Sequence, residues 1–281
     1  MVLCRFVHFT VVLMLFGAWV FKPLLAGRDT ALDRSLMRLN QWLAAVAMVS
    51  AVAWLLLITA SMVGTLDAAF DPTMLGKVLG KTFFGQVWAW HMLFNGLLMV
   101  LLLTPLRSSL PLRLILSGLL LATLAPVGHG AMLDGLNGQL LILNQIIHLT
   151  CVGAWLGGLM LLVMILMQPA GYAVGAILQR FSGVGYALVA GLSITGLINV
   201  RVLTGAFWPT PLLSGVALIL LIKVVLVALM LGLALFNRWQ IKGCEQRLST
   251  LRASVLLEWL LGIGAVAAVS LLGTMPPMIA G

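Results

Sequence analysis

The chain contains 281 residues, of which 62% are hydrophobic and 8% are charged, whereas a soluble domain is roughly 45–50% apolar and about 25% charged. Its mean hydropathy of +1.17 leaves too little polar surface to cover a folded domain in water, so most of its length must lie in lipid. These values exclude soluble enzymes, nucleic-acid-binding proteins and disordered regulators. The formal net charge of +9 is interpreted as membrane topology, because basic residues collect in the cytoplasmic loops of membrane proteins.

A helix that crosses a membrane needs about 20 mostly apolar residues, and polar, Gly and Pro residues divide the chain into eight such stretches. The sequence therefore predicts an all-α integral membrane protein of eight transmembrane helices, forming a single transmembrane domain over residues 1–281. The fourth stretch is short. The expected spans are 3–25, 36–63, 84–104, 112–127, 140–168, 177–200, 213–237 and 251–273.

Basic residues predict the orientation of these spans, since an even number of spans places both termini on one side of the membrane. We expect both termini in the periplasm, because the loops after the first, third, fifth and seventh spans carry most of the positive charge. Those loops contain Lys22, Arg28, Arg34, Arg38, Arg107, Arg113, Arg180, Arg238, Lys242, Arg247 and Arg252. The opposite side contains only Arg5, Lys77, Lys81 and Arg201.

Two short blocks recur in the first and fifth spans. Val7-His8-Phe9-Thr10 precedes Gly17-Ala18-Trp19 in the first span, and Ile147-His148-Leu149-Thr150 precedes Gly153-Ala154-Trp155 in the fifth. Four spans separate the copies, so both would run in the same direction. This predicts a 4+4 pseudo-repeat with half-repeats 1–130 and 140–281, and chance similarity among apolar helices is the alternative.

Histidines are the main candidates for function, because ionisable groups are costly inside a membrane. In the expected topology His8, His91, His129 and His148 all fall in the outer half of the bilayer or at its outer edge. His91 shares a helix face with Trp88 and Asn95, which fits either a metal ligand or a packed polar cluster.

The fifth span carries the clearest pattern of metal-ligating residue types. Asn144, His148, Cys151 and Trp155 follow the spacing i, i+4, i+7, i+11, which puts them on one stripe of a helix. Cys4 precedes His8 by four residues in the first span. Imidazole and thiolate ligands suit copper. The alternatives are a histidine that hydrogen-bonds a neighbouring helix and a cysteine that packs as a small apolar residue.

The loop from Gly128 to Gly135 has no basic residue, so it presents no electrostatic barrier to a cation. His129, Met132 or Asp134 could receive the ion there, and an ordinary outer turn is the alternative. The three cysteines of the chain show no CxxC spacing, so neither a disulfide framework nor a zinc knuckle is expected.

Two further charges fall inside predicted spans, Lys223 in the seventh and Glu258 in the eighth. We expect a structural ion pair between them, and a proton or ion relay is the alternative.

Several blocks of the sequence occur in a distinctive order. They are Arg5-Phe6-Val7-His8-Phe9, Phe84-Gly85-Gln86-Val87-Trp88, Gly128-His129-Gly130, the stretch from Asn144 to Gly158, Lys223, Asn237-Arg238 and Leu257-Glu258-Trp259. With these blocks the chain resembles, over nearly its full length, the copper resistance protein D (CopD) family of bacterial inner-membrane proteins.

The resemblance implies eight spans, copper handling at the inner membrane, and pairing with a small periplasmic copper-binding protein of the CopC type. His8, His129 and His148 match histidine positions of the family, whereas His91 falls where a relative has glutamine. No nucleotide-binding, nucleophile-elbow or HExxH motif is present, so no enzymatic activity is expected.

We therefore expect an inner-membrane protein that binds a copper ion (Cu⁺ or Cu²⁺) and transports it from periplasm to cytoplasm, along a path between the two half-bundles. The sharpest hypothesis is that His8 and His148 bind copper together where the first and fifth spans meet. The other predicted ligands are Cys4, Cys151, His129, His91 and Met132. Two alternatives stay open: an electron carrier with b-type haem, and a copper-sensing or scaffold subunit that transports nothing.

Overall fold

The computed structural model describes residues 1–25, 30–127, 133–169, 171–206, 208, 215–240 and 247–274, and the described chain is helical with no strand. The prediction of an all-α membrane protein is confirmed. The helices are α1 (Val2–Leu25), α2 (Thr30–Val63), α3 (Pro72–Lys81), α4 (Phe83–Leu103), α5 (Leu110–Ala122), α6 (Gly135–Met167), α7 (Val174–Thr204), α8 (Gly215–Gln240) and α9 (Leu248–Leu272).

Seven of these helices are long and apolar enough to cross a membrane, one fewer than the eight that were predicted. The expected span that is missing is the fourth, because α5 has 13 residues, fewer than the roughly 20 that a span needs. Proline limits this helix, with Pro111 in its first turn and Pro126 just after its end. The sequence analysis did not predict α3, a short helix that Asp71 caps by accepting a hydrogen bond from the backbone N–H of Thr73 at 2.8 Å.

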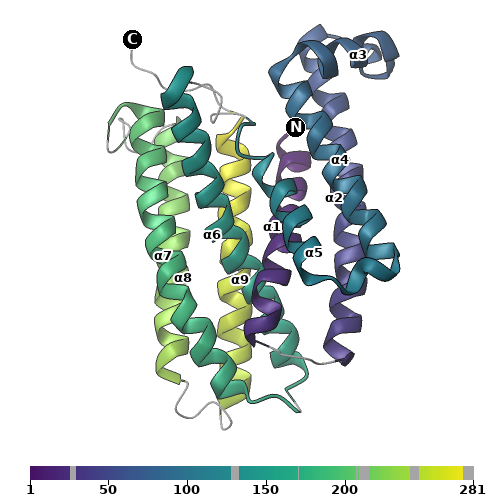
Figure 1. The fold of residues 1–281 in the computed structure, drawn as a ribbon. Coiled ribbons are helices and arrows are strands. Elements are labelled where there is room, and N and C mark those ends of the chain that lie inside the picture. The colour runs from purple at the N-terminus through teal and green to yellow at the C-terminus, as the bar shows by residue number, and fades with distance from the viewer. Residues whose placement is uncertain are drawn as a thin grey trace.

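The long helices form two groups, which are separate in Figure 1. In the first group α1 contacts α2, α2 contacts α4, α4 contacts α5, and α5 returns to α1. In the second group α6, α7, α8 and α9 make the same circuit of contacts. We call these the first ring and the second ring. Because each ring has four members, α1 and α4 lie diagonally opposite in the first, as α6 and α8 do in the second.

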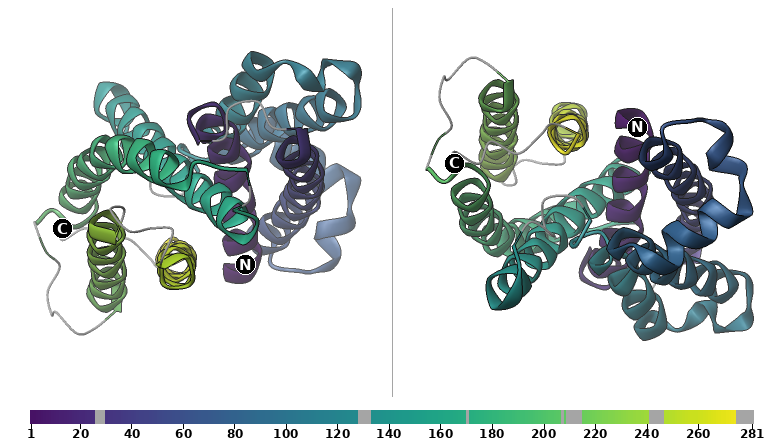
Figure 2. Two further views of the ribbon diagram at one scale, coloured as in Figure 1. Left: turned by 90° about the horizontal axis from the view of Figure 1, so that it is seen from below. Right: turned by 90° about the horizontal axis from the view of Figure 1, so that it is seen from above.

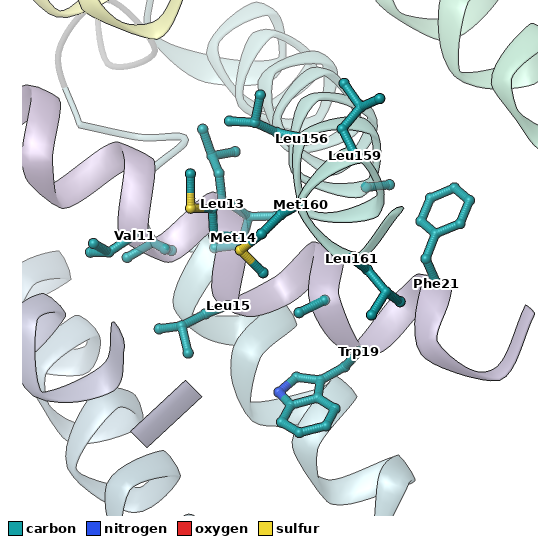
Figure 3. Close-up of a cluster of buried hydrophobic side chains, with 14 of the residues drawn as sticks. Val11, Leu13, Met14, Leu15, Trp19, Phe21, Leu156, Leu159, Met160 and Leu161 are labelled. Carbon is teal, nitrogen blue, oxygen red and sulfur yellow. The ribbon is translucent and has the colours of Figure 1, made fainter. Parts of the chain in front are cut away.

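The two rings meet where α1 packs against α6, and the end-on views in Figure 2 show α1 between the two groups. These are the most buried spans, with 56% of α1 and 78% of α6 buried against 39% or less for the others. Side chains of both helices interdigitate around the crossing, as Figure 3 shows for Leu13 and Met14 of α1 with Leu156 and Met160 of α6.

Glycines bring the two backbones into contact at this crossing. A Cβ atom added to Gly17 would lie 1.8 Å from the carbonyl oxygen of Gly153, and one added to Gly157 would lie 2.5 Å from the carbonyl carbon of Gly17. Small residues four apart, such as Gly153 and Gly157, are the usual means by which membrane helices approach closely. The contact leaves no room between the rings at this level.

The start of the first helix and the end of the last helix lie side by side. Arg5 of α1 donates a hydrogen bond to the carbonyl oxygen of Gly273, just after α9, at 3.0 Å. In Figure 1 α1 begins and α9 ends at the same end of the molecule. The two described ends of the chain therefore lie at the same end of the molecule.

Candidate metal site

A pair of histidines occupies the centre of the first ring. His8 of α1 and His91 of α4 meet across the diagonal, with 2.9 Å between their Nε2 atoms. Both residues are fully buried, with 0% of their surface exposed. The fold thus removes two imidazoles from solvent and points them at each other.

The other nitrogen of each ring contacts a hydroxyl group. His8 Nδ1 lies 2.8 Å from Oγ of Ser50 in α2, and His91 Nδ1 lies 2.7 Å from Oγ1 of Thr123, the residue that follows α5. Each hydroxyl hydrogen is already committed, because Ser50 donates to the carbonyl of Val46 and Thr123 to that of Leu120, both at 2.7 Å. A hydroxyl that keeps its hydrogen on its own helix accepts from the imidazole, and in that case each Nδ1 carries the hydrogen.

Two assignments of the ring hydrogens fit these contacts: one Nε2 atom donates to the other at 2.9 Å, or both Nδ1 atoms carry the hydrogen. With hydrogen on both Nδ1 atoms, the two Nε2 atoms present lone pairs to each other at 2.9 Å and repel unless a cation lies between them. Outer hydrogen bonds of this kind are how proteins orient metal-binding histidines. Imidazole nitrogen binds zinc at about 2 Å. Two ligands at that distance, separated by about 90° around one ion, would lie about as far apart as these two Nε2 atoms do.

Aromatic side chains hold the pair in place. Trp88 stacks on His91 with ring centroids 4.6 Å apart, and the rings of Trp54 and Trp88 lie 5.6 and 5.3 Å from that of His8. The indole N–H of Trp88 donates to the carbonyl of Ala51 at 2.9 Å, which fixes the stack. Two histidines that hold one haem iron bind it from opposite faces. With bonds of about 2 Å each, their nitrogens would lie about 4 Å apart. The two Nε2 atoms are closer together than that, so no macrocycle fits between them as they stand.

The described contacts of His8 and His148 lie in different rings and do not support the hypothesis of a site that the two residues share. Both nitrogens of His8 are engaged within the first ring, whereas His148 Nδ1 lies 2.8 Å from Oγ1 of Thr195 in α7. The reason is helical geometry. His8 precedes the contact glycine Gly17 by nine residues, and His148 precedes Gly157 by nine, which is about 180° around a helix.

The remaining predicted ligands lie in different places. The thiol of Cys4 donates to the carbonyl of Ser50 at 3.3 Å, one helical turn from His8. Cys151 faces α7, because a Cβ atom added to Gly191 would lie 2.7 Å from its sulfur. His129 and Met132 lie outside the described residues. Within the described ranges no group of three or more His, Cys, Asp and Glu side chains could hold a metal ion, so the histidine pair is the most compact candidate.

Sequence reasoning missed Ser50 and Thr123, which orient the two histidines. A hydroxyl in an apolar span commonly bonds its own helix, so nothing in the sequence distinguishes these two from other serines and threonines. The glycine pattern was more informative. Gly17, Gly153 and Gly157 mark the faces on which α1 and α6 meet, and counting from them places His8 and His148 on the opposite faces.

Buried polar atoms without hydrogen-bond partners continue from the pair along the first ring. Asn95, one turn after His91, is fully buried with both amide atoms unpaired. Further along the ring, Oδ1 of Asn40 and Nε1 of Trp19 are buried and unpaired as well. Buried polar groups are normally satisfied, so these atoms are free to contact water or an ion.

Glu258 forms a separate polar cluster in the second ring. Its carboxylate is 2% exposed and accepts hydrogen bonds from Nε1 of Trp155 at 3.0 Å and Nδ2 of Asn237 at 3.1 Å. The Ser254 hydroxyl donates to the amide oxygen of Asn237. A cavity of about 260 Å³ lined by residues of α6 to α9 adjoins this carboxylate.

The predicted ion pair between Lys223 and Glu258 does not form. Lys223 lies fourteen residues from Asn237 along α8, which is about 21 Å, and Asn237 is the residue that contacts Glu258. That separation exceeds the reach of a lysine side chain. The two charges therefore belong to different parts of the second ring.

Replacing Glu258 with glutamine is expected to lower the free energy of unfolding by about 1–3 kcal/mol, the cost of one buried polar group left unpaired. Ser254 fixes the amide of Asn237 so that its N–H faces residue 258, and glutamine offers one oxygen for two donors. Thermal unfolding in detergent measures the change. Asp134→Asn, at an exposed position, is the control, and equal stability of both variants would contradict the role of the carboxylate.

Two family models match the chain. Residues 1–140 match the N-terminal domain of copper resistance protein D-like proteins, and residues 175–272 match copper resistance protein D. The chain is 31% identical over 288 residues to the inner membrane protein YebZ of Escherichia coli K12, covering 97% of both chains. It is 29% identical over 194 residues to copper resistance protein D of Pseudomonas syringae pv. tomato, covering 62% of this chain and 61% of the relative. No solved structure matches it.

Proposed function

Since the chain belongs to the copper resistance protein D family, we propose that it is an inner-membrane protein that binds copper between His8 and His91 and passes it from the periplasm to the cytoplasm. One observation carries this proposal, namely the two buried Nε2 atoms that face each other at 2.9 Å. Imidazole nitrogen is a good ligand for copper in either common oxidation state. A periplasmic copper-binding protein of the CopC type is the proposed donor of the ion.

The unpaired polar atoms of the first ring support an inward path within that ring. Asn95 lies four residues after His91 in α4, and Asn40 lies ten residues before Ser50 in α2, which runs in the opposite direction. These separations correspond to about 6 Å and about 15 Å along the helices, on the same side of the histidine pair. The sequence favoured a path between the two half-bundles. The backbone contact of Gly17 with Gly153 argues for the interior of the first ring instead.

The direction of transport depends on the orientation in the membrane, and we propose that both termini are periplasmic. The basic residues favour it, and it puts the histidine pair nearer the periplasmic side, because His8 and His91 each lie near the outer start of their helices. Alkaline phosphatase fused after residue 281 is expected to be active, and the same fusion after Lys242 inactive. The reverse pattern would contradict the orientation and the proposed direction.

Copper uptake into proteoliposomes tests the function directly. Vesicles that contain the purified protein and enclose a copper-sensitive dye are expected to report copper entry, and the double variant His8→Ala/His91→Ala is expected to report none. His148→Ala, which removes a buried histidine outside the pair, is the matched control and should transport normally. Copper binding without entry by the wild-type protein would overturn transport in favour of a sensing or scaffold role.

A further inference from the structure

The cavity beside Glu258 has walls from all four helices of the second ring. Glu258 lines it from α9 and Ser182 lines it from α7, and these two helices lie diagonally opposite, since α6 and α8 each contact both of them. Most of the other lining side chains are leucine, valine, alanine or aromatic residues. The cavity therefore has a polar group on each of two opposite walls, with apolar surface between them.

The carboxyl group of Glu258 has hydrogen-bonding capacity left over. One of its oxygens accepts from Nε1 of Trp155 at 3.0 Å and the other from Nδ2 of Asn237 at 3.1 Å, and a carboxyl oxygen can take part in a second hydrogen bond. Among the described residues, no lysine or arginine lies within ion-pair distance of it. An ionisable group that is 2% exposed inside a membrane span, with no such partner, is a candidate for ligand binding.

The opposite wall offers a hydrogen-bond donor. Nη1 of Arg238 donates to Oγ of Ser182 at 2.8 Å, and within the described chain the Ser182 side chain makes no other hydrogen bond. The hydrogen of this hydroxyl is thus available to a ligand. The Arg238 guanidinium also lies 4.9 Å from the centroid of the Tyr186 ring, which helps to hold it beside Ser182.

The cavity can be reached from the membrane between α7 and α8. These two helices pack together less closely than any other neighbours in the ring. Two lining residues beside this gap, Tyr186 of α7 and Leu235 of α8, are 53% and 50% exposed, and both belong to membrane spans. Trp155, Phe181 and Tyr186 add aromatic rings to the lining, against which another ring packs favourably. A ligand that enters here comes from the lipid.

We propose that the second ring binds a membrane quinone, with its ring between Glu258 and Ser182 and its apolar chain leaving between α7 and α8. An ionised carboxyl group accepts from a quinol hydroxyl, a protonated one donates to a quinone carbonyl, and a serine hydroxyl can donate to either. Both redox forms of the ligand therefore match the two walls. A phospholipid acyl chain would fill the apolar part and leave both polar walls without a partner. This site is separate from the histidine pair and goes beyond the proposed copper function.

Calorimetric titration of the purified protein in detergent with decylubiquinone tests the proposal. We expect saturable binding of one molecule per chain. The arene analogue of this probe, which has the same substituents but lacks the two quinone oxygens, is expected to bind at least about 10-fold more weakly, because two hydrogen bonds are lost. Ser182→Ala should weaken the binding of decylubiquinone several-fold and leave that of the arene analogue unchanged, a difference that a general loss of structure would not produce.

A cavity-filling substitution locates the binding site. Ala234→Phe places a ring in the cavity that Ala234 lines, and it is expected to abolish binding of decylubiquinone. Ala228→Phe, at an exposed position of the same helix, is the matched control and should bind as the wild-type protein does. Copper affinity should be unchanged in both variants, since the histidine pair lies in the first ring.

Three results would overturn the inference. They are no saturable binding of decylubiquinone, undiminished binding by Ala234→Phe, and equal affinities of the wild-type protein for decylubiquinone and its arene analogue. The last result would assign the cavity to any apolar chain, such as that of a phospholipid. The comparison of the two ligands decides the matter even where Ala234→Phe does not fold.

Discussion

Replacing His91 with phenylalanine is expected to weaken copper binding by the purified protein by more than about 100-fold, the upper end of the loss when a partner outside the ligand set is removed. The substitution deletes one of the two Nε2 atoms that face each other at 2.9 Å. Phenylalanine keeps a ring for Trp88 to stack on, where the centroids are 4.6 Å apart, so the packing of the first ring is preserved. Competition with a copper chelator of known affinity measures the change.

The matched control is His148→Phe, which makes the same substitution in the second ring and should leave copper affinity within a few-fold of the wild-type value. An affinity unchanged by His91→Phe would show that copper binds elsewhere. Equal losses in both variants would mean that the two rings share one site, contrary to the separate contacts of the two histidines.

Replacing Gly17 with leucine is expected to prevent stable folding. Even a Cβ atom at this position would lie 1.8 Å from the carbonyl oxygen of Gly153, and a backbone atom in the middle of a packed helix cannot turn aside as a side chain does. Gly17→Ala should already cost more than the 1–3 kcal/mol that is typical of an extra methylene in a packed core. The yield of monodisperse protein and its thermal unfolding in detergent measure both effects.

Gly118→Ala is the control, because its added Cβ would meet only a ring carbon of Phe16 at an ordinary 3.7 Å. It should be neutral or stabilising, since alanine is favoured over glycine inside a helix by up to about 1 kcal/mol. If Gly17→Ala were as stable as Gly118→Ala, the close approach of α1 and α6 would be contradicted.

The long spans were predictable from the sequence because hydrophobic length alone defines them. The expected window 84–104 and the observed α4, Phe83–Leu103, differ by one residue at each end. The expected window 112–127 was less accurate, since α5 ends at Ala122. Residues 123–127 are apolar enough to continue a span, but Pro126 lacks the N–H that a helix interior requires.

The histidine pair was not predictable, because it depends on which helices lie diagonally opposite. Hydropathy locates the long spans along the sequence but does not say which of them are neighbours. The similarity of the blocks around His8 and His148 suggested that these residues meet, when it reflects instead equivalent contacts with Ser50 and Thr195. His91 lacked any comparable signal, since its partner is 83 residues earlier in the chain.

The early end of α5 has a consequence for how an ion reaches the pair. Thr123, one residue past α5, contacts His91, so this wall of the ring changes from helix to turn at the depth of the pair. By contrast, the first eight residues of α4 precede His91 on that same side of the pair, and they extend about 12 Å from it. The turn is closed by single i→i+3 hydrogen bonds, from Leu124 to Leu121 and from Ala125 to Ala122, each 3.1 Å long. On this side the buried imidazoles are therefore bordered by a turn that i→i+3 hydrogen bonds close, where the other walls of the ring are long helices.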